Sequence, residues 1–366
     1  MRILFAGGGT GGHINPAISI ADYIRGQEPN FEALFIGTKR GLETKLVPKA
    51  GYPIQYIDIQ GFDRRRLWRN AAVMYKLVQS RRECRNIMRE FQPDAVVCTG
   101  GYVSGPVAMA AAKLHVPALI HEQNVYPGLT VRGAEKYVNY VAVSFQETMN
   151  HMKVPEKCVL TGNPIREEIL KANAAQARKS LGLSQKPFVL VFGGSLGAEK
   201  INETMIGVLR KINGENKVQV LFGTGDRNYQ QINQRLRDEN IQLRDDIQVV
   251  PYIDNMAQVM AAADLVVARS GAITVSEIAA LGKPSILIPS PNVVRNHQEQ
   301  NAREFEAHGG AAVITEDVLT PETLYKKIME MVSDPLALAE MGANVQKLAK
   351  TDALESIYQL VLKMTK

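Results

Sequence analysis

Residues 2–13, RILFAGGGTGGH, join an apolar run to a glycine-rich turn, and helical sequence follows from about Pro16. Residues 188–202, FVLVFGGSLGAEKIN, repeat this plan about 186 positions later. An apolar strand, a tight glycine turn and a helix are the opening of a Rossmann-like domain. The two openings therefore predict two Rossmann-like domains in tandem.

Short β-rich runs alternate with helical stretches along the chain, which is typical of parallel sheets with crossover helices. The predicted fold class is α/β, and a length of 366 residues favours two domains. We expect domains at 1–163 and 164–344, because Asn163-Pro164 breaks regular structure. Predicted strands lie near residues 2–6, 32–37, 54–58, 95–98, 117–120, 141–143, 188–192, 218–222, 247–250, 265–268 and 285–289.

Four loops of small residues follow predicted strands. Backbone N–H groups in such turns, and at the helix N-termini behind them, bind anions. We expect them to face a cleft at the carboxyl ends of both sheets, with room for a diphosphate on each side. For any one loop, the alternative is that its glycines only make a tight turn. The loops are residues 7–12 (GGGTGG), 100–106 (GGYVSGP), 193–197 (GGSLG) and 269–272 (RSGA).

Gly7, Gly9 and Gly12 match the dinucleotide fingerprint GxGxxG. An NAD site also needs an acidic residue at the end of the second strand, where it bonds the ribose. Residues 35–40, FIGTKR, place no carboxylate there, although their two basic side chains suit a 2′-phosphate. With no Tyr-x-x-x-Lys pair and no other hydride-transfer constellation, a dehydrogenase is disfavoured.

The composition argues against several classes of protein. No run of about 18 apolar residues is present, and the apolar start is too short for a signal peptide. Cys84, Cys98 and Cys158 have no ligand-like spacing, so we expect no disulfide framework and no zinc site, as in a reducing cytoplasm. No Asp-x-Asp pair occurs. We therefore expect no metal and no bound cofactor, with diphosphate charge offset by helix N-termini and cationic side chains.

The net charge of +6 is concentrated in one region. Residues 1–163 hold 20 Lys and Arg against 13 Asp and Glu, and residues 61–90 alone hold nine against three. Such a patch favours an anionic partner: nucleic acid, a phosphate-bearing substrate or anionic lipid. A solvated basic helix face is the alternative. Nucleic acid is disfavoured because the aromatic residues of the patch lack stacking spacing.

An apolar stripe at helical spacing is predicted to face the core. A basic loop around Trp68 precedes it, and arginines beside an exposed aromatic suit the interface of an anionic bilayer. We expect this loop, residues 62–69, to bind the inner face of the membrane reversibly. The alternative is a packed tryptophan with solvated arginines. The stripe comprises Leu67, Ala71, Met74, Val78, Ile87 and Phe91, and the membrane residues are Arg64, Arg65, Arg66, Trp68 and Arg69.

Seven ordered motifs, which cover essentially the whole chain, resemble those of the MurG family, bacterial UDP-N-acetylglucosamine:lipid I N-acetylglucosaminyltransferases of glycosyltransferase family 28. The resemblance implies the GT-B architecture, two Rossmann-like domains with parallel sheets facing a central cleft. It also implies that a C-terminal helix, about residues 345–366, packs back on the first domain. The motifs are GGGTGGHINPA, GGYVSGP, HEQNVYPGLT, GNPIR, GGSLGAEKIN, ARSGAITVSEIAALGKPSILIPSP and NHQEQNA.

The implied reaction is inverting transfer of GlcNAc from UDP-GlcNAc to the C4 hydroxyl of MurNAc in undecaprenyl-diphosphate-MurNAc-pentapeptide (lipid I). It makes lipid II for peptidoglycan synthesis at the cytoplasmic face of the bacterial cell membrane. The first domain takes the acceptor and the second takes the donor. Alternatives are another GT-B nucleotide-sugar enzyme, either a diacylglycerol glycosyltransferase or a UDP-GlcNAc 2-epimerase, and, in a different class, a nucleotide-binding or RNA-binding module that uses the basic patch at 61–90. HEQN and GGYVSGP argue against both enzymes.

His13, which ends the first glycine loop, is expected to be the general base, since imidazole titrates near neutral pH. A role in ordering the loop or bonding a phosphate is the alternative. His121 and Glu122 form a second possible base pair. The acceptor-side loops contain Gly100, Gly101, Tyr102, His121 and Glu122.

The resemblance also implies a set of donor-binding residues. Arg166 and Ser195 would meet the diphosphate, Ile253 the uracil through its backbone, and Glu277 the ribose hydroxyls. The full set is Thr10, Gly11, Gly12, Asn124, Arg166, Ser195, Ile253, Ala272, Ile273, Thr274, Val275, Ser276, Glu277, Gln298 and Asn301.

Some of these residues have plainer interpretations. Thr274 and Glu277 have the spacing of a helix capping box. Gln298 and Asn301 are expected to bind sugar hydroxyls, but their i, i+3 spacing also fits a solvated helix face. Residues 163–166 can be a linker turn alone.

Overall fold

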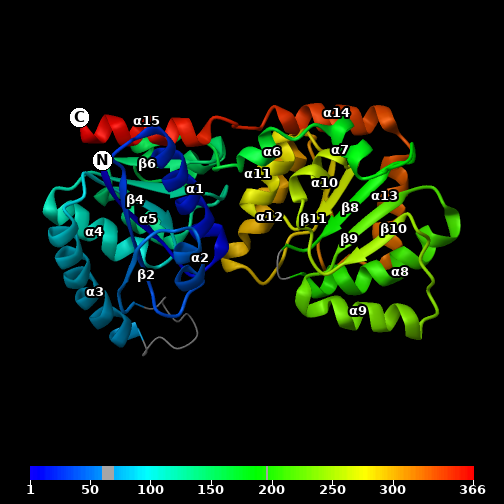
Figure 1. The fold of residues 1–366 in the computed structure, drawn as a ribbon, viewed down its shortest axis with the longest axis horizontal. Coiled ribbons are helices and arrows are strands. Elements are labelled where there is room, and N and C mark those ends of the chain that lie inside the picture. Colours follow the sequence, from blue (N-terminus) through cyan, green and yellow to red (C-terminus); the bar gives the residue numbers. More distant parts are fainter. Residues whose placement is uncertain (60–69, 195–196) are drawn as a thin grey trace. The chain divides into compact units, whose positions relative to one another are not determined.

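The computed structural model describes residues 1–59, 70–194 and 197–366. The chain divides into two compact units (Figure 1). Unit 1 comprises Met1–Ile165 and Lys350–Lys366, and unit 2 comprises Arg166–Ala349. The first boundary lies close to the predicted Asn163-Pro164 break. Residues 345–349, which we expected in the C-terminal helix of the first domain, belong to unit 2.

Unit 1 contains a seven-stranded sheet within its described residues, in the order β3-β2-β1-β4-β5-β6-β7. All its neighbouring strands run parallel. Side chains alternate between the two faces of a strand. In β1, Leu4 and Ala6 therefore join one core cluster, while Ile3 and Phe5 join the other. The strands are β1 (Arg2–Gly7), β2 (Glu32–Gly37), β3 (Ile54–Tyr56), β4 (Ala95–Gly100), β5 (Ala118–Glu122), β6 (Tyr140–Val143) and β7 (Cys158–Leu160).

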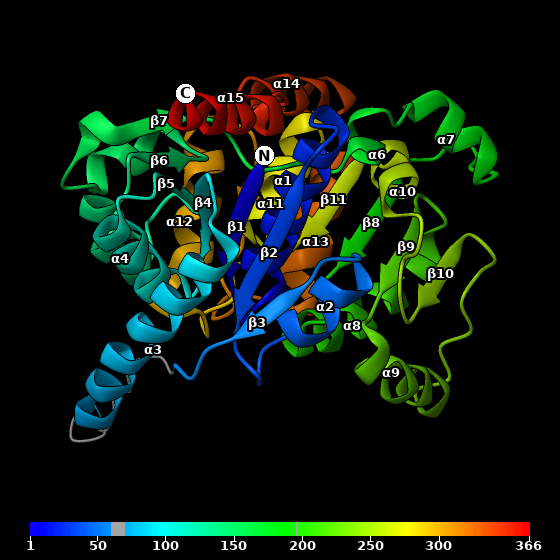
Figure 2. The same cartoon turned by 60° about the vertical axis from the view of Figure 1, so that its left-hand side comes forward.

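Helices cover both faces of this sheet. Side chains of α3 and α4 pack in the cluster with Leu4, and side chains of α1 and α15 pack in the cluster with Phe5. Figure 2 shows β1, β2 and β3 side by side and α15 near α1, which it contacts. The helices are α1 (Gly11–Gln27), α2 (Glu43–Lys49), α3 (Asn70–Phe91), α4 (Ser104–Leu114), α5 (Leu129–Ala134) and α15 (Ala353–Thr365).

The stripe predicted on α3 is only partly correct. Ile87 is buried as expected, but Val78 is 51% exposed, and the nearby Tyr75 is 72% exposed. Leu67 and the side chains of Ala71 and Met74 lie outside the described residues. The prediction for Val78 was wrong because helical spacing alone does not show where along a helix the core ends.

Unit 2 repeats the plan with a six-stranded parallel sheet, counted over the part of the chain that the structure describes, in the order β10-β9-β8-β11-β12-β13. Its largest core cluster joins the strands to α8, α9 and α13. The strands are β8 (Phe188–Phe192), β9 (Gln219–Gly223), β10 (Ile247–Val250), β11 (Leu265–Ala268), β12 (Ser285–Leu287) and β13 (Ala312–Val313). The helices are α6 (Glu167–Leu170), α7 (Ala174–Ser180), α8 (Glu199–Glu215), α9 (Asp226–Asp238), α10 (Met256–Ala262), α11 (Ala272–Ala280), α12 (His297–Ala307), α13 (Pro321–Val332) and α14 (Pro335–Gln346).

Candidate functional site

Each sheet has a place where the strand order reverses. In unit 1 the chain proceeds from β1 toward β2 on one side and from β4 toward β5 on the other, so the loops after β1 and β4 diverge. In unit 2 the same holds for β8 and β11. The crevice beyond the carboxyl ends of strands at such a point is the usual ligand site of an α/β sheet. The four small-residue loops predicted from the sequence follow these four strands.

The two loops of unit 1 interlock because their glycines leave no room for side chains. A Cβ on Gly7 would lie 2.2 Å from the Thr99 hydroxyl oxygen. Gly101 has a φ of +72°, and a Cβ there would lie 2.3 Å from the carbonyl oxygen of Gly8. Backbone from the β1 loop is therefore packed directly on backbone from the β4 loop.

His13 lies where these loops meet. Its Nδ1 is 3.2 Å from the carbonyl oxygen of Gly8 and 3.3 Å from the Thr10 hydroxyl. A carbonyl only accepts, so this geometry assigns the proton to Nδ1 and makes Nε2 the basic nitrogen. A Cβ on Gly100 would lie 3.1 Å from Nε2. The arrangement suits an imidazole that takes a proton at Nε2.

Glu43, which sequence reasoning missed, holds the first glycine loop. This fully buried carboxylate accepts a hydrogen bond from the backbone N–H of Gly9 at 3.0 Å, and from the N–H and hydroxyl of Thr38 at 2.9 Å each. One N–H that a dinucleotide-binding loop would offer to phosphate is thus bound by an internal carboxylate. The dinucleotide fingerprint places an acidic residue at the end of the second strand, β2. In this chain the carboxylate is that of Glu43, the first residue of α2, which is a position that the fingerprint does not include.

The HEQN segment at the end of β5 lies inside unit 1. Glu122 accepts hydrogen bonds from the backbone N–H of Asn124, from its side-chain amide and from the N–H of Gly128, at 3.0, 3.1 and 2.8 Å. Burial raises the pKa of Glu122, and these hydrogen bonds oppose the rise. The carboxylate therefore shapes the turn that carries Asn124.

His121 is fully buried in a satisfied network. Its Nε2 is 2.9 Å from the carbonyl oxygen of Gly162, and its Nδ1 is 2.9 Å from the side-chain amide nitrogen of Gln123. Burial lowers the pKa of His121 to about 4. A proton on Nδ1 would also displace the Gln123 amide. This environment argues against His121 as the base of the second possible pair.

In unit 2, Arg166 and Glu277 form an ion pair. The Nε and Nη2 atoms of Arg166 lie 3.1 and 3.0 Å from Oε1 of Glu277. The arginine side chain is 48% exposed and the glutamate side chain 7%. Burial raises the pKa of Glu277, and Arg166 opposes the rise. The pair joins the start of unit 2 to the second turn of α11.

The capping-box interpretation of residues 274–277 is wrong. Helix α11 begins at Ala272 after an N-cap at Gly271, and that cap has no side-chain hydrogen bond. Thr274 and Glu277 therefore both lie within the helix. Its N-terminal residues, 272–276, follow the loop at the end of β11.

Ser270 organises that loop and was also missed. Its hydroxyl donates to the carbonyl oxygen of Gln298 at 2.7 Å, and its own carbonyl accepts from the Asn301 amide at 3.1 Å. Asn301 is fully buried, so the solvated-face interpretation is wrong for it. The Gln298 side-chain oxygen accepts from the N–H of Ser290 at 2.9 Å. In this arrangement both residues of α12 fix the loops around Ser270 and Ser290.

The remaining predicted residues fall into three groups. In unit 1, Thr10 is the N-cap of α1, Gly11 and Gly12 begin that helix, and the ring of Tyr102 lies 3.6 Å from the position of a Cβ on Gly9. In unit 2, Ile253 is buried beyond β10, beside Gly223 at the end of β9. Residues outside the described ranges are Arg64, Arg65, Arg66, Trp68, Arg69 and Ser195.

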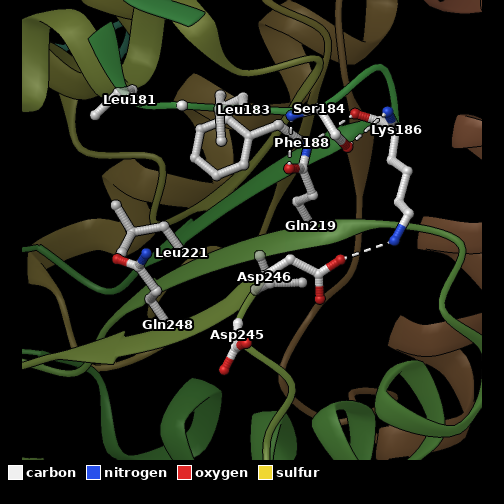
Figure 3. Close-up of a pocket in the computed structure, with 12 residues that line it drawn as sticks. Leu181, Leu183, Ser184, Lys186, Phe188, Gln219, Leu221, Asp245, Asp246 and Gln248 are labelled. Carbon is white, nitrogen blue, oxygen red and sulfur yellow. Dashed lines mark hydrogen bonds and ion pairs between the residues drawn. The ribbon is translucent and has the colours of Figure 1, made fainter. Parts of the chain in front are cut away.

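A cavity of about 360 Å³ lies at the end of the second sheet that is opposite the glycine loops (Figure 3). Phe188 and Gln219, the first residues of β8 and β9, line it, and the ion pair between Lys186 and Asp246 spans 2.9 Å at its side. The cavity is at the amino ends of the strands, away from the glycine loops. We do not assign it to the site.

Among the described residues, no helix combines the length and the apolar character needed to cross a bilayer. The described side chains likewise include no group of three or more His, Cys, Asp or Glu residues placed to hold a metal ion.

Family models match both units. The glycosyltransferase family 28 N-terminal domain matches residues 3–143, and the glycosyltransferase family 28 C-terminal domain matches residues 188–357. The chain belongs to glycosyltransferase family 28. The predicted enzyme class, a glycosyltransferase, is thereby confirmed, and each family 28 domain contains one pair of the small-residue loops described above.

A relative from Thermoanaerobacter sp. (strain X514) is 48% identical to this family 28 chain over the full length of both. It is named UDP-N-acetylglucosamine–N-acetylmuramyl-(pentapeptide) pyrophosphoryl-undecaprenol N-acetylglucosamine transferase. A crystal structure of Acinetobacter baumannii MurG superposes with a TM-score of 0.81 and 28% identity over 99% of each chain. These comparisons confirm the MurG-family resemblance and the predicted fold class, two Rossmann-like α/β domains of the GT-B type.

The UDP-GlcNAc 2-epimerase of Neisseria meningitidis superposes with a TM-score of 0.69 at 12% identity, over 99% of this chain and 100% of that one. At this identity the likeness concerns the fold alone.

Proposed function

We propose that this enzyme transfers GlcNAc from UDP-GlcNAc to the C4 hydroxyl of MurNAc in lipid I, with inversion, making lipid II for peptidoglycan synthesis. The observation that carries the proposal is the 48% identity, over the full length of both chains, to a relative named for this transfer. Among the site residues that the structure describes, nothing beyond the shared fold favours the epimerase alternative.

The proposed chemistry is a direct displacement. Nε2 of His13 removes the proton from the acceptor hydroxyl as its oxygen bonds to C1 of GlcNAc. The bond from C1 to the diphosphate oxygen breaks, and UDP leaves with the electron pair. The assignment of the ring proton to Nδ1 supports this role. The acceptor's sugar and diphosphate are proposed to lie at the loops of Gly9 and Gly101.

The donor is proposed to bind at the β8 and β11 loops of unit 2. The N-terminus of α11 offers backbone N–H groups for the diphosphate, and the half-exposed Arg166 offers a guanidinium group. Glu277 accepts from ribose hydroxyls while holding Arg166 in place. Ile253 meets the uracil through its backbone, and Ser195 meets the diphosphate. Helix N-termini and Arg166 then offset the diphosphate charge without a metal.

The acceptor's lipid tail requires access to a membrane surface. We propose reversible peripheral binding to the cytoplasmic face of the cell membrane through the basic loop at residues 62–69, with no nucleic-acid partner. The exposed Tyr75 and Val78 on α3, which follows this loop, support the proposal. Aromatic side chains favour the bilayer interface, and each basic residue near an anionic surface contributes about 1 kcal/mol.

Co-sedimentation with vesicles tests the membrane proposal. We expect binding to anionic but not neutral vesicles, weakened by salt, and weaker still when the loop arginines are changed to Gln. Equal binding by this variant and wild type would refute the role of the loop. The changed residues are Arg64, Arg65, Arg66 and Arg69. A control of the same chemistry changes Arg227, Arg235 and Arg237 of α9 to Gln.

UDP release from UDP-GlcNAc tests the reaction. We expect release to depend on a short-chain lipid I analogue and to match the formation of its GlcNAc-bearing product. Acceptor-independent formation of an epimerised sugar nucleotide would contradict the proposal. Turnover with diacylglycerol in place of the lipid I analogue would also contradict it.

A further inference from the structure

The Gly8–Gly9 peptide group lies between two functional side chains. Its N–H donates to Oε2 of Glu43 at 3.0 Å, and its carbonyl oxygen is the acceptor 3.2 Å from Nδ1 of His13. A peptide group is planar and polarises as one unit. The carboxylate, the peptide group and the imidazole therefore form one continuous chain of hydrogen bonds.

The carboxylate end of this chain is tightly fixed. Oε1 of Glu43 accepts both Thr38 donors, which leaves Oε2 for the N–H of Gly9. A Cβ on Gly41 would lie 1.9 Å from Oε2, and a Cβ on Gly37 would lie 2.6 Å from Cγ of Glu43. The backbone at Gly37 and Gly41 therefore packs directly on Glu43, and a side chain at either glycine would displace the carboxylate.

We propose that Glu43 is a positioning residue for His13, acting through the Gly8–Gly9 peptide group. The inference rests on the proposed role of His13 as base. Accepting the N–H of Gly9 draws negative charge onto the carbonyl oxygen of Gly8, because linked hydrogen bonds polarise one another. That oxygen then holds the Nδ1–H tautomer and stabilises the imidazolium formed when Nε2 takes a proton, since a charged donor makes the stronger bond.

The contacts described around the loop identify Glu43 as a source of this charge. Among the described residues, the titratable side chains that the contacts place next to the loop are Glu43 from α2 and Tyr102 from the turn after β4. From β4 itself, the Thr99 hydroxyl donates to the carbonyl oxygen of His13 at 2.7 Å, and Gly100 faces the ring without a side chain. Glu43 therefore supplies the negative charge on this path.

Two variants interrupt the path in different ways. Glu43→Gln leaves one acceptor oxygen for three donors, so the side chain cannot serve Gly9 and Thr38 together. Gly41→Ala keeps the charge but places a methyl group where Oε2 now lies. Glu135→Gln is the matched control: it is buried in the same unit and accepts from the backbone N–H of Lys153 at 2.9 Å.

The first readout is the titration of His13 by NMR with labelled histidine, its resonance assigned from the spectrum of His13→Ala. In Glu43→Gln and in Gly41→Ala we expect the His13 midpoint to move to lower pH, while Glu135→Gln leaves it in place. Thermal unfolding and UDP binding confirm that each variant is folded. A folded variant of Glu43 or Gly41 with an unchanged His13 midpoint overturns the inference.

The second readout is the pH profile of kcat with the lipid I analogue. We expect the acidic limb to move to lower pH and kcat at neutral pH to fall roughly 10–100-fold, the cost seen for outer partners of metal-bound imidazoles. KM for UDP-GlcNAc should stay near the wild-type value. Full activity in His13→Ala would instead refute the base role. The titration midpoint of His13, measured by NMR, tests the link to Glu43 independently of that role.

Discussion

Positions 100 and 101 have no room for a side chain, so backbone atoms lie next to the imidazole of His13. Both residues have positive φ, +103° and +72°. The first faces the His13 ring, and the second lies against the carbonyl group of Gly8. Two glycines thus bring a polar backbone and a basic nitrogen together at the carboxyl ends of β1 and β4.

Replacing His13 by Ala is expected to lower kcat by roughly 10²–10⁴, the usual contribution of a general base, with UDP affinity nearly unchanged. The imidazole touches the acceptor in this proposal and not the nucleotide. Steady-state rates and UDP titration calorimetry measure the two effects. If kcat stays within a few-fold of wild type, His13 orders the loop and is not the base.

Glu277→Gln is expected to weaken UDP-GlcNAc binding by roughly 1.5–3 kcal/mol, the range for a hydrogen bond to a charged group. It should also raise the melting temperature at neutral pH. Burial raises the folded-state pKa of Glu277, so the stability contributed by this group is present at low pH and is lost as pH rises through the raised value.

The melting temperatures of wild type and Glu277→Gln should therefore converge as pH falls toward the ordinary range of a glutamate. Calorimetric scans between pH 4 and pH 8, together with donor titrations, check both parts. A variant that melts earlier than wild type at neutral pH and keeps its donor affinity would show that Glu277 is structural.

Motif reasoning identified His13 and the glycines because their roles follow from local spacing after a strand. It missed Glu43 and Ser270, since each acts on backbone that lies far from it in the sequence or in another loop. It also left open a solvated helix face for Asn301, whereas the side chain is buried and its amide donates to the carbonyl oxygen of Ser270. Which face of a helix is covered depends on the neighbouring elements, which residue spacing does not specify.

At the scale of elements, one buried network joins the ends of several strands in unit 1. Gln123, after β5, donates to the carbonyl oxygen of Thr99 in β4 at 2.8 Å, and to Nδ1 of His121. His121 in turn reaches Gly162, after β7. The Thr99 hydroxyl donates to the carbonyl oxygen of His13, so this network helps to hold His13 in the proposed acceptor site.

The network should weaken in acid. The folded-state pKa of His121, about 4, lies below the unfolded value, so its contribution to stability is present above pH 6.5 and is lost as pH falls through 4. The full loss is roughly 3 kcal/mol, at about 1.4 kcal/mol for each pKa unit. Urea unfolding at several pH values measures it.

His121→Gln should flatten that pH dependence, because glutamine does not titrate. His308→Gln is the control, since the His308 side chain is half exposed. If His121→Gln loses as much stability as wild type between pH 6.5 and pH 4, acid acts on other groups and the network is not its target.

At the scale of the whole molecule, the proposed site handles a diphosphate with helix N-termini and Arg166. We therefore expect turnover in excess chelator without added divalent ions. Initial rates with and without Mg²⁺ test this expectation. Modest stimulation is compatible with screening of charge, but complete loss of activity that Mg²⁺ restores would overturn the mechanism.

The repeated strand–glycine–helix opening correctly predicted two parallel sheets, but not all of their strands. Strands β7 and β13 were missed because they are short edge strands, Cys158–Leu160 and Ala312–Val313, in which no alternation develops. The assignment of the last two helices to the two units was harder to predict from the sequence. Helix α14 remains in unit 2 and α15 in unit 1, and the sequence has no glycine or proline between them to mark the crossing.

Unit 1 is discontinuous, because α15 follows all of unit 2 in the chain and yet contributes Ile357 and Val361 to the core cluster around Phe5. During translation, the sheet of unit 1 emerges from the ribosome first, and α1 can cover part of its apolar face, but the rest stays uncovered until α15 is made. Unit 2 is continuous and can fold ahead of it. A nascent chain halted within unit 2 would expose the apolar surface that α15 normally covers. Such a chain is expected to bind chaperones and, if never completed, to be degraded by proteases.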